Sequence, residues 1–305
     1  MDELLELTDK PQADEIYMIA GWRQWADAGA TSSALPQYLI DHTKAHKIGR
    51  IKSDGFYLYQ LPGTHHFLRP EVKFEDGYRK EIRTSRNEFF YTGSEHKGLV
   101  IFMGDEPHLS IERYADVFFN AAKELGVKRV AAVGGVYGGV PYDKDRQVSC
   151  SYSMRHMKEE LKEYAVRFSN YEGGVSIGSY MADRAEFHGV EYFAFYAFVP
   201  MYDFSQLSQR MQGISIENDY KAWYDLMRRL NYMFHLDIDL SDLSHRSDEL
   251  MTSMAAKIDE LEKATPHMPV RAFVDKLSDG FTEMSFVPLD DVWKRELGDL
   301  FKDLE

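Results

Sequence analysis

A short, mainly apolar strand is the feature that most constrains how this chain can fold. It occupies residues 127–133 and directly follows an amphipathic segment that begins after Ser110 and ends at Gly126. Ser110 suits the N-cap of a helix, and Gly126 suits the left-handed position after its last turn. A strand without polar alternation is buried on both faces, as strands of parallel sheets are. The chain is therefore expected to contain a helix that leads into a parallel strand.

Other strands extend this sheet, and they are of two kinds. Some are apolar runs, which predict burial on both faces, and others alternate loosely in polarity, as strands of an antiparallel part do. Pro200 is expected to end the last apolar run. The predicted fold class is therefore α/β, with a mixed sheet flanked by helices. The apolar runs span residues 16–20, 99–103 and 192–199, and the alternating runs span residues 47–60, 79–92 and 147–152.

After about residue 204 the pattern changes to helical periodicity. No Gly/Ser-rich linker precedes this part, so its helices are expected to pack on the preceding part rather than to move freely. The predicted organisation is an α/β body over residues 14–204 and a helical C-terminal region over residues 205–305, packed on the body. The helical segments span residues 219–234, 240–264, 270–277 and 290–304.

Charge and composition exclude several classes of partner. The 305 residues include 50 acidic and 36 basic side chains, a formal net charge of -14, and no dense Lys/Arg run. Nucleic-acid binders usually show a basic stripe, and a negative field repels anionic membranes, so neither partner is expected. The single cysteine, Cys150, can form no disulfide within the chain. With polar first residues and no apolar run of membrane-spanning length, a cytoplasmic protein is predicted.

Five motifs follow one another along the chain, most of them at the ends of predicted strands. They are Gly21-Trp22-Arg23-Gln24-Trp25-Ala26-Asp27-Ala28-Gly29, Gly104-Asp105-Glu106-Pro107, Leu125-Gly126-Val127 with Val133-Gly134-Gly135, Tyr171-Glu172-Gly173-Gly174 with Val199-Pro200-Met201-Tyr202, and Leu236-Asp237-Ile238-Asp239-Leu240. This ordered set resembles the proteasome assembly chaperone 2 family, in its bacterial and archaeal branch, over residues 16–277. The resemblance implies a phosphorylase/hydrolase-like α/β fold, a homo-oligomer and no established catalytic residues. Relatives of this kind help to assemble the proteasome core particle.

Three departures separate the chain from the family's pattern. Related chaperones that dock on proteasome pockets end in a hydrophobic–Tyr–any tail, whereas this sequence ends Phe301-Lys302-Asp303-Leu304-Glu305. The stretch Asp143-Lys144-Asp145-Arg146 replaces a His-x-Arg-Pro stretch, and Met201 stands where a His commonly follows Val-Pro. Shared polar chemistry at these loops is therefore not expected.

A serine-hydrolase motif occurs once. Gly174-Val175-Ser176-Ile177-Gly178 matches the G-x-S-x-G nucleophile elbow and precedes a predicted helix. An elbow needs a buried strand before it, and residues 166–170 make a poor strand. Asp203 with His235 or His245 would have to complete the triad. Because glycines in a strand–helix loop explain the match equally well, no catalytic residue is predicted.

A glycine-rich loop and a histidine pair are two further candidates for ligand sites. Gly134, Gly135 and Tyr137 follow a strand, but the loop is not G-x-G-x-x-G and no helix comes next. We interpret it as a loop at the sheet edge, with ligand or partner contact as the alternative, and expect no cofactor. His42 and His46 lie four apart on a predicted helix, as two metal ligands would. They lack a third ligand, so no metal site is predicted.

The loop after the first strand carries the more informative residues. Trp22, Trp25 and Asp27 lie at the carboxyl end of that strand, where open α/β sheets bind ligands, and Glu106 follows another strand. Two carboxylates beside two aromatics could hold a small polar ligand or a basic peptide. Alternatively, Asp27 caps a helix and both tryptophans fill the core.

The sequence favours a non-catalytic assembly or scaffold protein that resembles proteasome assembly chaperones and acts as a homo-oligomer. Its expected partner is a protein, with proteasome subunits among the candidates. The alternative is a small-molecule (nucleoside-like) binding protein or a hydrolase acting at the strand-end loops, which rests on fold analogy alone. A closed pocket with convergent polar groups at those loops would favour the alternative.

Overall fold

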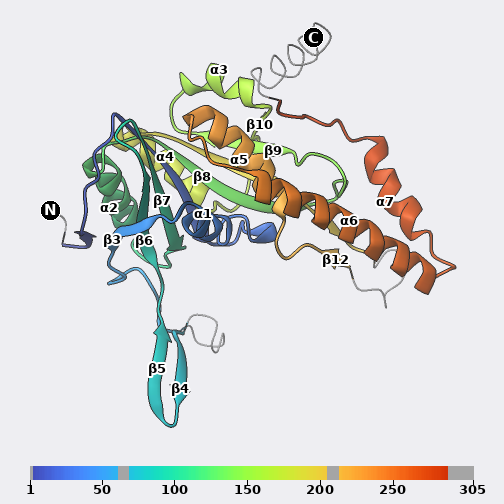
Figure 1. Cartoon of the computed structure of the whole chain (residues 1–305), viewed down its shortest axis with the longest axis horizontal. Helices are drawn as coiled ribbons and strands as arrows, with labels where there is room; N and C mark the ends of the chain where they lie inside the picture. Colours follow the sequence, from blue (N-terminus) through green and yellow to red (C-terminus); the bar gives the residue numbers. More distant parts are fainter. Residues whose placement is uncertain (1–2, 61–68, 205–212, 288–305) are drawn as a thin grey trace, which may run out of the picture.

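The computed structural model describes residues 3–60, 69–204 and 213–287, and its centre is a large mixed sheet (Figure 1). The strand order is β1-β3-β6-β7-β2-β8-β11-β9-β10, with β12 paired to β11. The prediction of a mixed sheet flanked by helices is confirmed. The strands of this sheet are β1 (Leu5–Leu7), β2 (Glu15–Arg23), β3 (His46–Ile51), β6 (Asn87–Gly93), β7 (Lys97–Asp105), β8 (Val127–Gly138), β9 (Val148–Tyr152), β10 (Arg167–Phe168), β11 (Glu191–Tyr202) and β12 (Ile214–Ser215).

The middle of the sheet is parallel, as its apolar strands predict. β7, β2, β8 and β11 run in the same direction, whereas β6 is antiparallel to β7, β3 to β6, and β9 to β11. The four parallel strands therefore end at one edge of the sheet, the carboxyl edge. Loops that are far apart in the sequence meet there.

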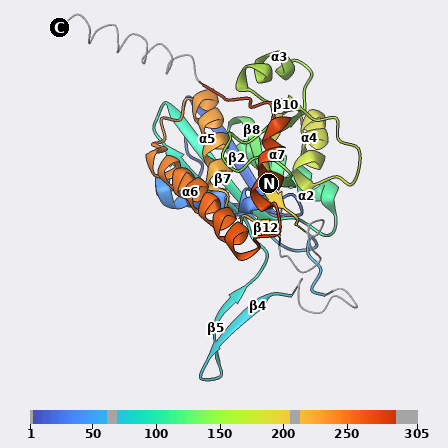
Figure 2. The ribbon, with the colours of Figure 1, turned by 90° about the vertical axis from the view of Figure 1, so that its right-hand side faces the viewer.

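Helices cover both faces of the sheet, and the period-two alternation of each strand decides which layer a side chain meets (Figure 2). On β8, Ala131 and Val133 join the core under α1, α3, α5, α6 and α7, whereas Val130 and Ala132 join the core under α2 and α4. The α-helices are α1 (Leu35–Thr43), α2 (Ile111–Glu124), α3 (Met157–Leu161), α4 (Ile177–His188), α5 (Tyr220–Phe234), α6 (Ser241–Ala264) and α7 (Val270–Asp279).

The ends of α2 match the prediction only in part. Gly126 follows the helix with φ of 68°, and its N–H donates to the carbonyl of Lys123 (3.0 Å), as a left-handed glycine should. Ser110 precedes the helix, but its φ of 51° is also left-handed, and its side chain makes no capping hydrogen bond. The predicted serine cap is therefore wrong.

The prediction that Pro200 ends the last apolar strand is also wrong. β11 continues to Tyr202, with Pro200 opposite Gly138 of β8. On its other side, β11 pairs with β9 only as far as Ala197. Proline removes a backbone donor from a strand, and it is tolerated here because β9 no longer runs beside it.

The predicted strand over residues 79–92 is two strands with different roles. β6 lies in the large sheet, whereas β5 (Tyr78–Arg83) pairs with β4 (Glu71–Glu75) in a separate two-stranded sheet. Asp76 and Gly77 join β4 to β5, both with positive φ, as a two-residue hairpin turn requires. This hairpin projects from the body in both views (Figures 1 and 2). The strand predicted over residues 47–60 is likewise shorter, because β3 ends at Ile51.

Three of the four helices predicted after residue 204 correspond to α5, α6 and α7, and the fourth, over residues 290–304, lies outside the described residues. α5 is held against the loop after β2. The Asp219 N–H and the Trp223 indole Nε1 both donate to the Gly29 carbonyl, each at 3.0 Å. The division into a body and a C-terminal region stays a prediction. None of the helices over the described ranges is long and apolar enough to cross a membrane.

Candidate functional site

The candidate site lies at the carboxyl edge, where the loops after β2 and β7 are joined. The Glu106 N–H donates to the Arg23 carbonyl (3.1 Å), and a parallel bridge links Asp27 to Gly135 at the end of β8. The predicted candidates all come from these loops and strand ends. They are Trp22, Trp25, Asp27, Glu106, Gly134, Gly135 and Tyr137.

Trp22 is a core residue rather than a surface contact. Its side chain is fully buried against Phe102 and Phe118. The indole Nε1 donates to the Tyr114 hydroxyl (2.9 Å), which in turn donates to the Asn87 side-chain carbonyl (2.8 Å). Because its one polar group is satisfied inside the protein, Trp22 holds the end of β2 on α2 and offers nothing to a ligand.

Trp25 and Glu106 come together at the surface, as expected. The Glu106 carboxylate accepts the Trp25 N–H (3.4 Å) through one oxygen and the Ile177 N–H (3.0 Å) through the other. Ile177 is the first residue of α4, so the negative charge lies at the positive end of a helix dipole. Glu106 thereby fixes the position of the Trp25 backbone, while the Trp25 side chain remains 70% exposed.

Asp27 has a structural role in its own loop. Its carboxylate oxygen Oδ1 accepts the N–H groups of Ser32 (2.8 Å) and Ser33 (2.9 Å). Burial raises the pKa of Asp27, and the hydrogen bonds from these serines oppose that rise. The predicted helix cap is wrong: Asp27 makes no side-chain capping hydrogen bond to the short helix that follows it, and α1 begins at Leu35 with Ala34 as its N-cap. The carboxylate is half-buried and already bonded, so it is poorly placed to bind a ligand.

Gly134 and Gly135 are required by close packing. A Cβ on Gly135 would lie 2.1 Å from the Ala28 carbonyl oxygen, and one on Gly134 would lie 2.6 Å from the Tyr196 ring. The Gly135 N–H donates to the Ala26 carbonyl (3.0 Å), which seats the loop after β2 directly on β8. These glycines therefore allow two backbones to approach, and they do not form a phosphate cradle.

Exposed apolar side chains gather on the loops and strand ends of the carboxyl edge. Two of these residues, Trp25 and Tyr137, were among the candidates predicted from sequence. The other members were not predicted, because the exposure of a loop residue depends on how the loop folds. The ring of Trp25 lies 3.7 Å from a Cβ built on Gly174, which places it beside the loop before α4. The set, called here the edge patch, consists of Trp25, Leu109, Tyr137, Tyr171, Val175 and Met201.

Ser176 is a helix cap and not a nucleophile. Its backbone is extended (φ -81°, ψ 161°), and its hydroxyl accepts the Ser179 N–H (3.4 Å) as the N-cap of α4. The same hydroxyl lies 2.7 Å from the Tyr196 hydroxyl and is buried. A nucleophile elbow is a strained turn that points the serine at solvent and at a histidine. The hydrogen-bond partners of the Ser176 hydroxyl are a serine and a tyrosine, so the motif match is structural.

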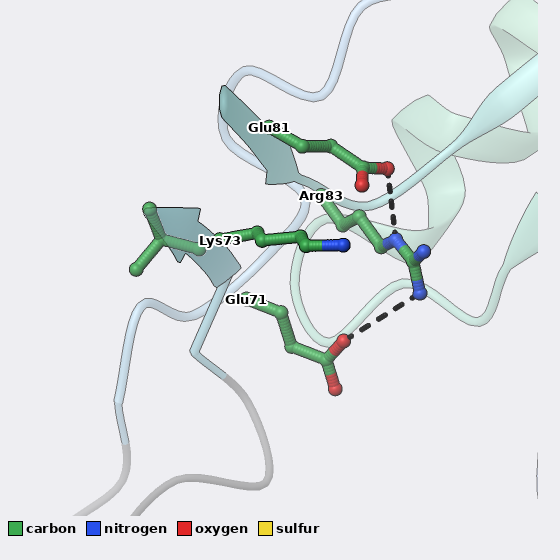
Figure 3. Close-up of a pocket in the computed structure, with 5 residues that line it drawn as sticks. Glu71, Lys73, Glu81 and Arg83 are labelled. Atoms are coloured by element: carbon green, nitrogen blue, oxygen red, sulfur yellow. Dashed lines mark hydrogen bonds and ion pairs between the residues drawn. The ribbon is translucent and has the colours of Figure 1, made fainter. Parts of the chain in front are cut away.

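Two hollows formed by described residues lie away from this edge. One, of about 190 Å³, is lined by residues of the β4–β5 hairpin, among them Glu71, Lys73, Glu81 and Arg83 (Figure 3). The other, of about 250 Å³, lies at the amino ends of the strands and includes Arg129, whose guanidinium pairs with the carboxylates of Glu160 and Glu191, both at 2.6 Å. Neither hollow is lined by a strand-end candidate.

The histidine pair does not lie on one helix. His42 belongs to α1, whereas His46 opens β3 and faces the Asp9 carboxylate at 3.2 Å. Within residues 3–60, 69–204 and 213–287, no three His, Cys, Asp or Glu side chains are grouped so as to hold a metal ion.

Comparison with known proteins agrees with the ordered motifs. A family model described as the PAC2 family matches residues 21–258, from the end of β2 to α6. The chain belongs to the PAC2 family. Comparison with curated proteins gives no match.

Several solved structures share this fold. A PAC2 family protein from Streptomyces avermitilis is 23% identical, with a TM-score of 0.66 over 80% of this chain and 97% of the other. A proteasome-assembly chaperone homologue from Mycobacterium tuberculosis is 20% identical, with a TM-score of 0.67 over 80% and 95%. An archaeal homologue from Pyrococcus furiosus is 15% identical, with a TM-score of 0.53 over 86% and 94%. At these identities the likeness establishes the fold.

One departure of this chain from the PAC2 pattern has a structural explanation. Arg146, in the altered stretch before β9, is buried and pairs with Asp219 through Nε–Oδ2 (2.9 Å) and Nη2–Oδ1 (3.2 Å). Its Nη1 also donates to the carbonyls of Pro141 (3.3 Å), Tyr142 (2.9 Å) and Lys144 (3.1 Å). Arg146 therefore fastens α5 to the α/β body, and all three nitrogens of its guanidinium are engaged inside the protein.

Proposed function

We propose that this PAC2 protein is a non-catalytic assembly or scaffold protein of the cytoplasm, which acts as a homo-oligomer and binds a protein partner through the edge patch. The observation that carries the proposal is the gathering of exposed apolar side chains on loops fixed by hydrogen bonds. Exposed apolar patches of this kind mark protein interaction sites, and aromatic residues are enriched there.

The chemistry of the strand-end residues also supports a binding role over catalysis. The polar groups that a catalytic site would need are engaged with the protein itself: Glu106 with two backbone N–H groups, Asp27 with two more, and Ser176 with a tyrosine. A nucleoside-like ligand would need a concave, enclosed site with free convergent groups. The edge patch instead offers apolar surface on a rigid support, which suits a folded protein.

Proteasome subunits are the first partners to test, because two of the structural relatives are described as proteasome-assembly chaperone homologues. The tagged chain is used to capture partners from extract of its native cells, and the leading one is purified and titrated. We expect the double variant Trp25→Ser/Tyr137→Ser to weaken binding by at least about 30-fold, as loss of central aromatic anchors does.

Phe187→Ser is the matched control. Phe187 is 73% exposed, about as much as Trp25, but it lies near the opposite end of α4 from Ile177. The proposal fails if Phe187→Ser weakens the complex as much as the double variant does. It also fails if the double variant binds like the wild type.

A further inference from the structure

The β4–β5 hairpin stands apart from the rest of the molecule (Figure 1). β4 and β5 pair with each other and with no strand of the large sheet, and every residue of both strands is exposed. A two-stranded hairpin on its own is only marginally stable in water. A hairpin kept in this position therefore gains from a surface that covers it.

One face of the hairpin is suited to water, and the other is suited to burial. Glu71, Lys73, Glu81 and Arg83 lie together on one side (Figure 3), where the Arg83 guanidinium pairs with Glu81 at 2.9 Å. Because side chains alternate along a strand, the residues next to these in β4 and β5 face the other way. That face carries Val72, Phe74 and Ile82, and Val72 is directly opposite Ile82.

The apolar face is exposed to an extent unusual for side chains of this size. Val72 is 48% exposed, Phe74 61% and Ile82 49%, and Tyr78 beside the turn is 78% exposed. Val72, Phe74 and Ile82 share one face of the hairpin, whereas Tyr78 pairs with Glu75 on the other. Soluble proteins use exposed apolar surface of this kind for docking. The hairpin thus presents an apolar face to a partner and a charged face to water.

Charge indicates which surface the hairpin fits. Residues 69–86 contain six basic and four acidic side chains, which is a net charge of +2. Because the whole chain has a net charge of -14, the remainder of the chain has a net charge of -16. A polyanion such as a nucleic acid would be repelled by that remainder. A second copy of the chain supplies acidic surface in folded form: α6 alone has six acidic and three basic side chains, with Asp248, Glu249 and Glu260 exposed.

We propose that the β4–β5 hairpin is an arm that docks on a second copy of this chain through Val72, Phe74 and Ile82. The inference rests on the homo-oligomer of the proposed function and names the surface that forms it. The arm contacts the partner copy with its apolar face, and its basic side chains lie near the acidic body of that copy.

The test measures the mass of the full-length protein by sedimentation velocity over a range of concentrations. We expect the triple variant Val72→Ser/Phe74→Ser/Ile82→Ser to raise the dissociation constant of the oligomer at least about tenfold, while Phe187→Ser leaves it unchanged. The charge-reversal variant Arg79→Glu/Lys80→Glu should weaken assembly most at low salt, because exposed charges are screened over about 10 Å at 0.1 M. Melting curves should show the same midpoint for the dissociated variants as for dissociated wild type.

A deletion variant, in which residues 71–83 are replaced by a Gly-Ser-Gly linker, guards against misfolding of the triple variant. It should be folded and dissociated. An oligomer that survives both changes overturns the inference but leaves the proposed homo-oligomer standing. A wild type that stays at one protomer at all concentrations overturns both. To separate self-docking from another protein, Phe74→Cys carrying a photo-crosslinker should yield crosslinks between copies, and crosslinks only to a different protein would contradict the inference.

Discussion

The ion pair between Arg146 and Asp219 offers the sharpest test of how this fold is held together. Arg146 is 1% exposed and Asp219 is fully buried. Asp219 also caps α5, because its Oδ1 accepts the Ala222 N–H (3.0 Å). Arg146→Met keeps most of the side-chain volume but leaves the Asp219 carboxylate buried without its cation. Asp219→Asn keeps the shape and the acceptor but removes the charge.

The expected loss follows from this burial. Removing one partner of a buried, hydrogen-bonded ion pair destabilises a protein by roughly 3–5 kcal/mol, because the other charge stays in a medium that solvates it poorly. Arg146→Met should therefore lower the free energy of unfolding by about 3 kcal/mol or more. For a chain of this size the melting temperature should fall by about 5 °C. The double variant Arg146→Met/Asp219→Asn should lose less than the two single losses combined.

Urea unfolding followed by far-ultraviolet circular dichroism measures these free energies. The exposed pair of Arg50 with Glu6 (2.6 Å) provides the control, since Arg50→Met at the surface should change stability by less than about 1 kcal/mol. The reasoning is refuted if Arg146→Met costs no more than Arg50→Met. Additive losses in the double variant would show that the two side chains do not stabilise each other.

Three further predictions concern single residues. Burial opposes ionisation of Asp145, but Lys221 and Arg228 outweigh this effect and lower the pKa of Asp145 to about 2. The resulting stability is present above the unfolded pKa of about 3.9 and is lost as the pH falls to about 2. In acid-unfolding curves, wild type should therefore lose up to about 2 kcal/mol more than Asp145→Asn across that window. Burial raises the pKa of the Cys150 thiol, and the side chain is inaccessible, so Ellman's reagent should label it only in denaturant; rapid labelling of the native protein would contradict this packing. Ser176→Ala should lower stability by about 1 kcal/mol through loss of a helix cap, and the wild type should not react with fluorophosphonate probes; stoichiometric labelling at Ser176 would restore the hydrolase interpretation.

The central strands could be predicted from sequence because a run of apolar residues has few other places to lie than between two layers of helices. The limits of those strands could not. Trp22 and Trp25 are identical in type and three residues apart, yet one is buried and the other exposed. β2 continues to Arg23, which gives Trp22 the same alternation as Met18 and Ala20, and these point toward α2 and α4. A strand prediction that stopped at residue 20 could not make that distinction.

Other parts of the site depended on contacts between distant segments. Gly134 and Gly135 are explained by the loop that lies on them, and nothing local in the sequence marks that approach. Ser176 fits a hydrolase motif, whereas its role is set by Tyr196 on a neighbouring strand. The carboxyl ends of two strands suggested that Glu106 lies at the same edge as Trp25. Its hydrogen bonds from the Trp25 N–H and the Ile177 N–H depend on the folded loop and on the position of α4.

The hairpin occupies the connection between β3 and β6, two strands that already pair directly with each other in the large sheet. The pairing of β3 with β6 therefore does not depend on the hairpin. Because the residues of β4 and β5 are exposed, substitutions in the hairpin leave the hydrophobic core unchanged. Such an insertion can diverge faster than the scaffold that carries it. Lineages could then alter which subunits recognise one another while inheriting the same fold, and an engineer could exchange the hairpin to redirect assembly.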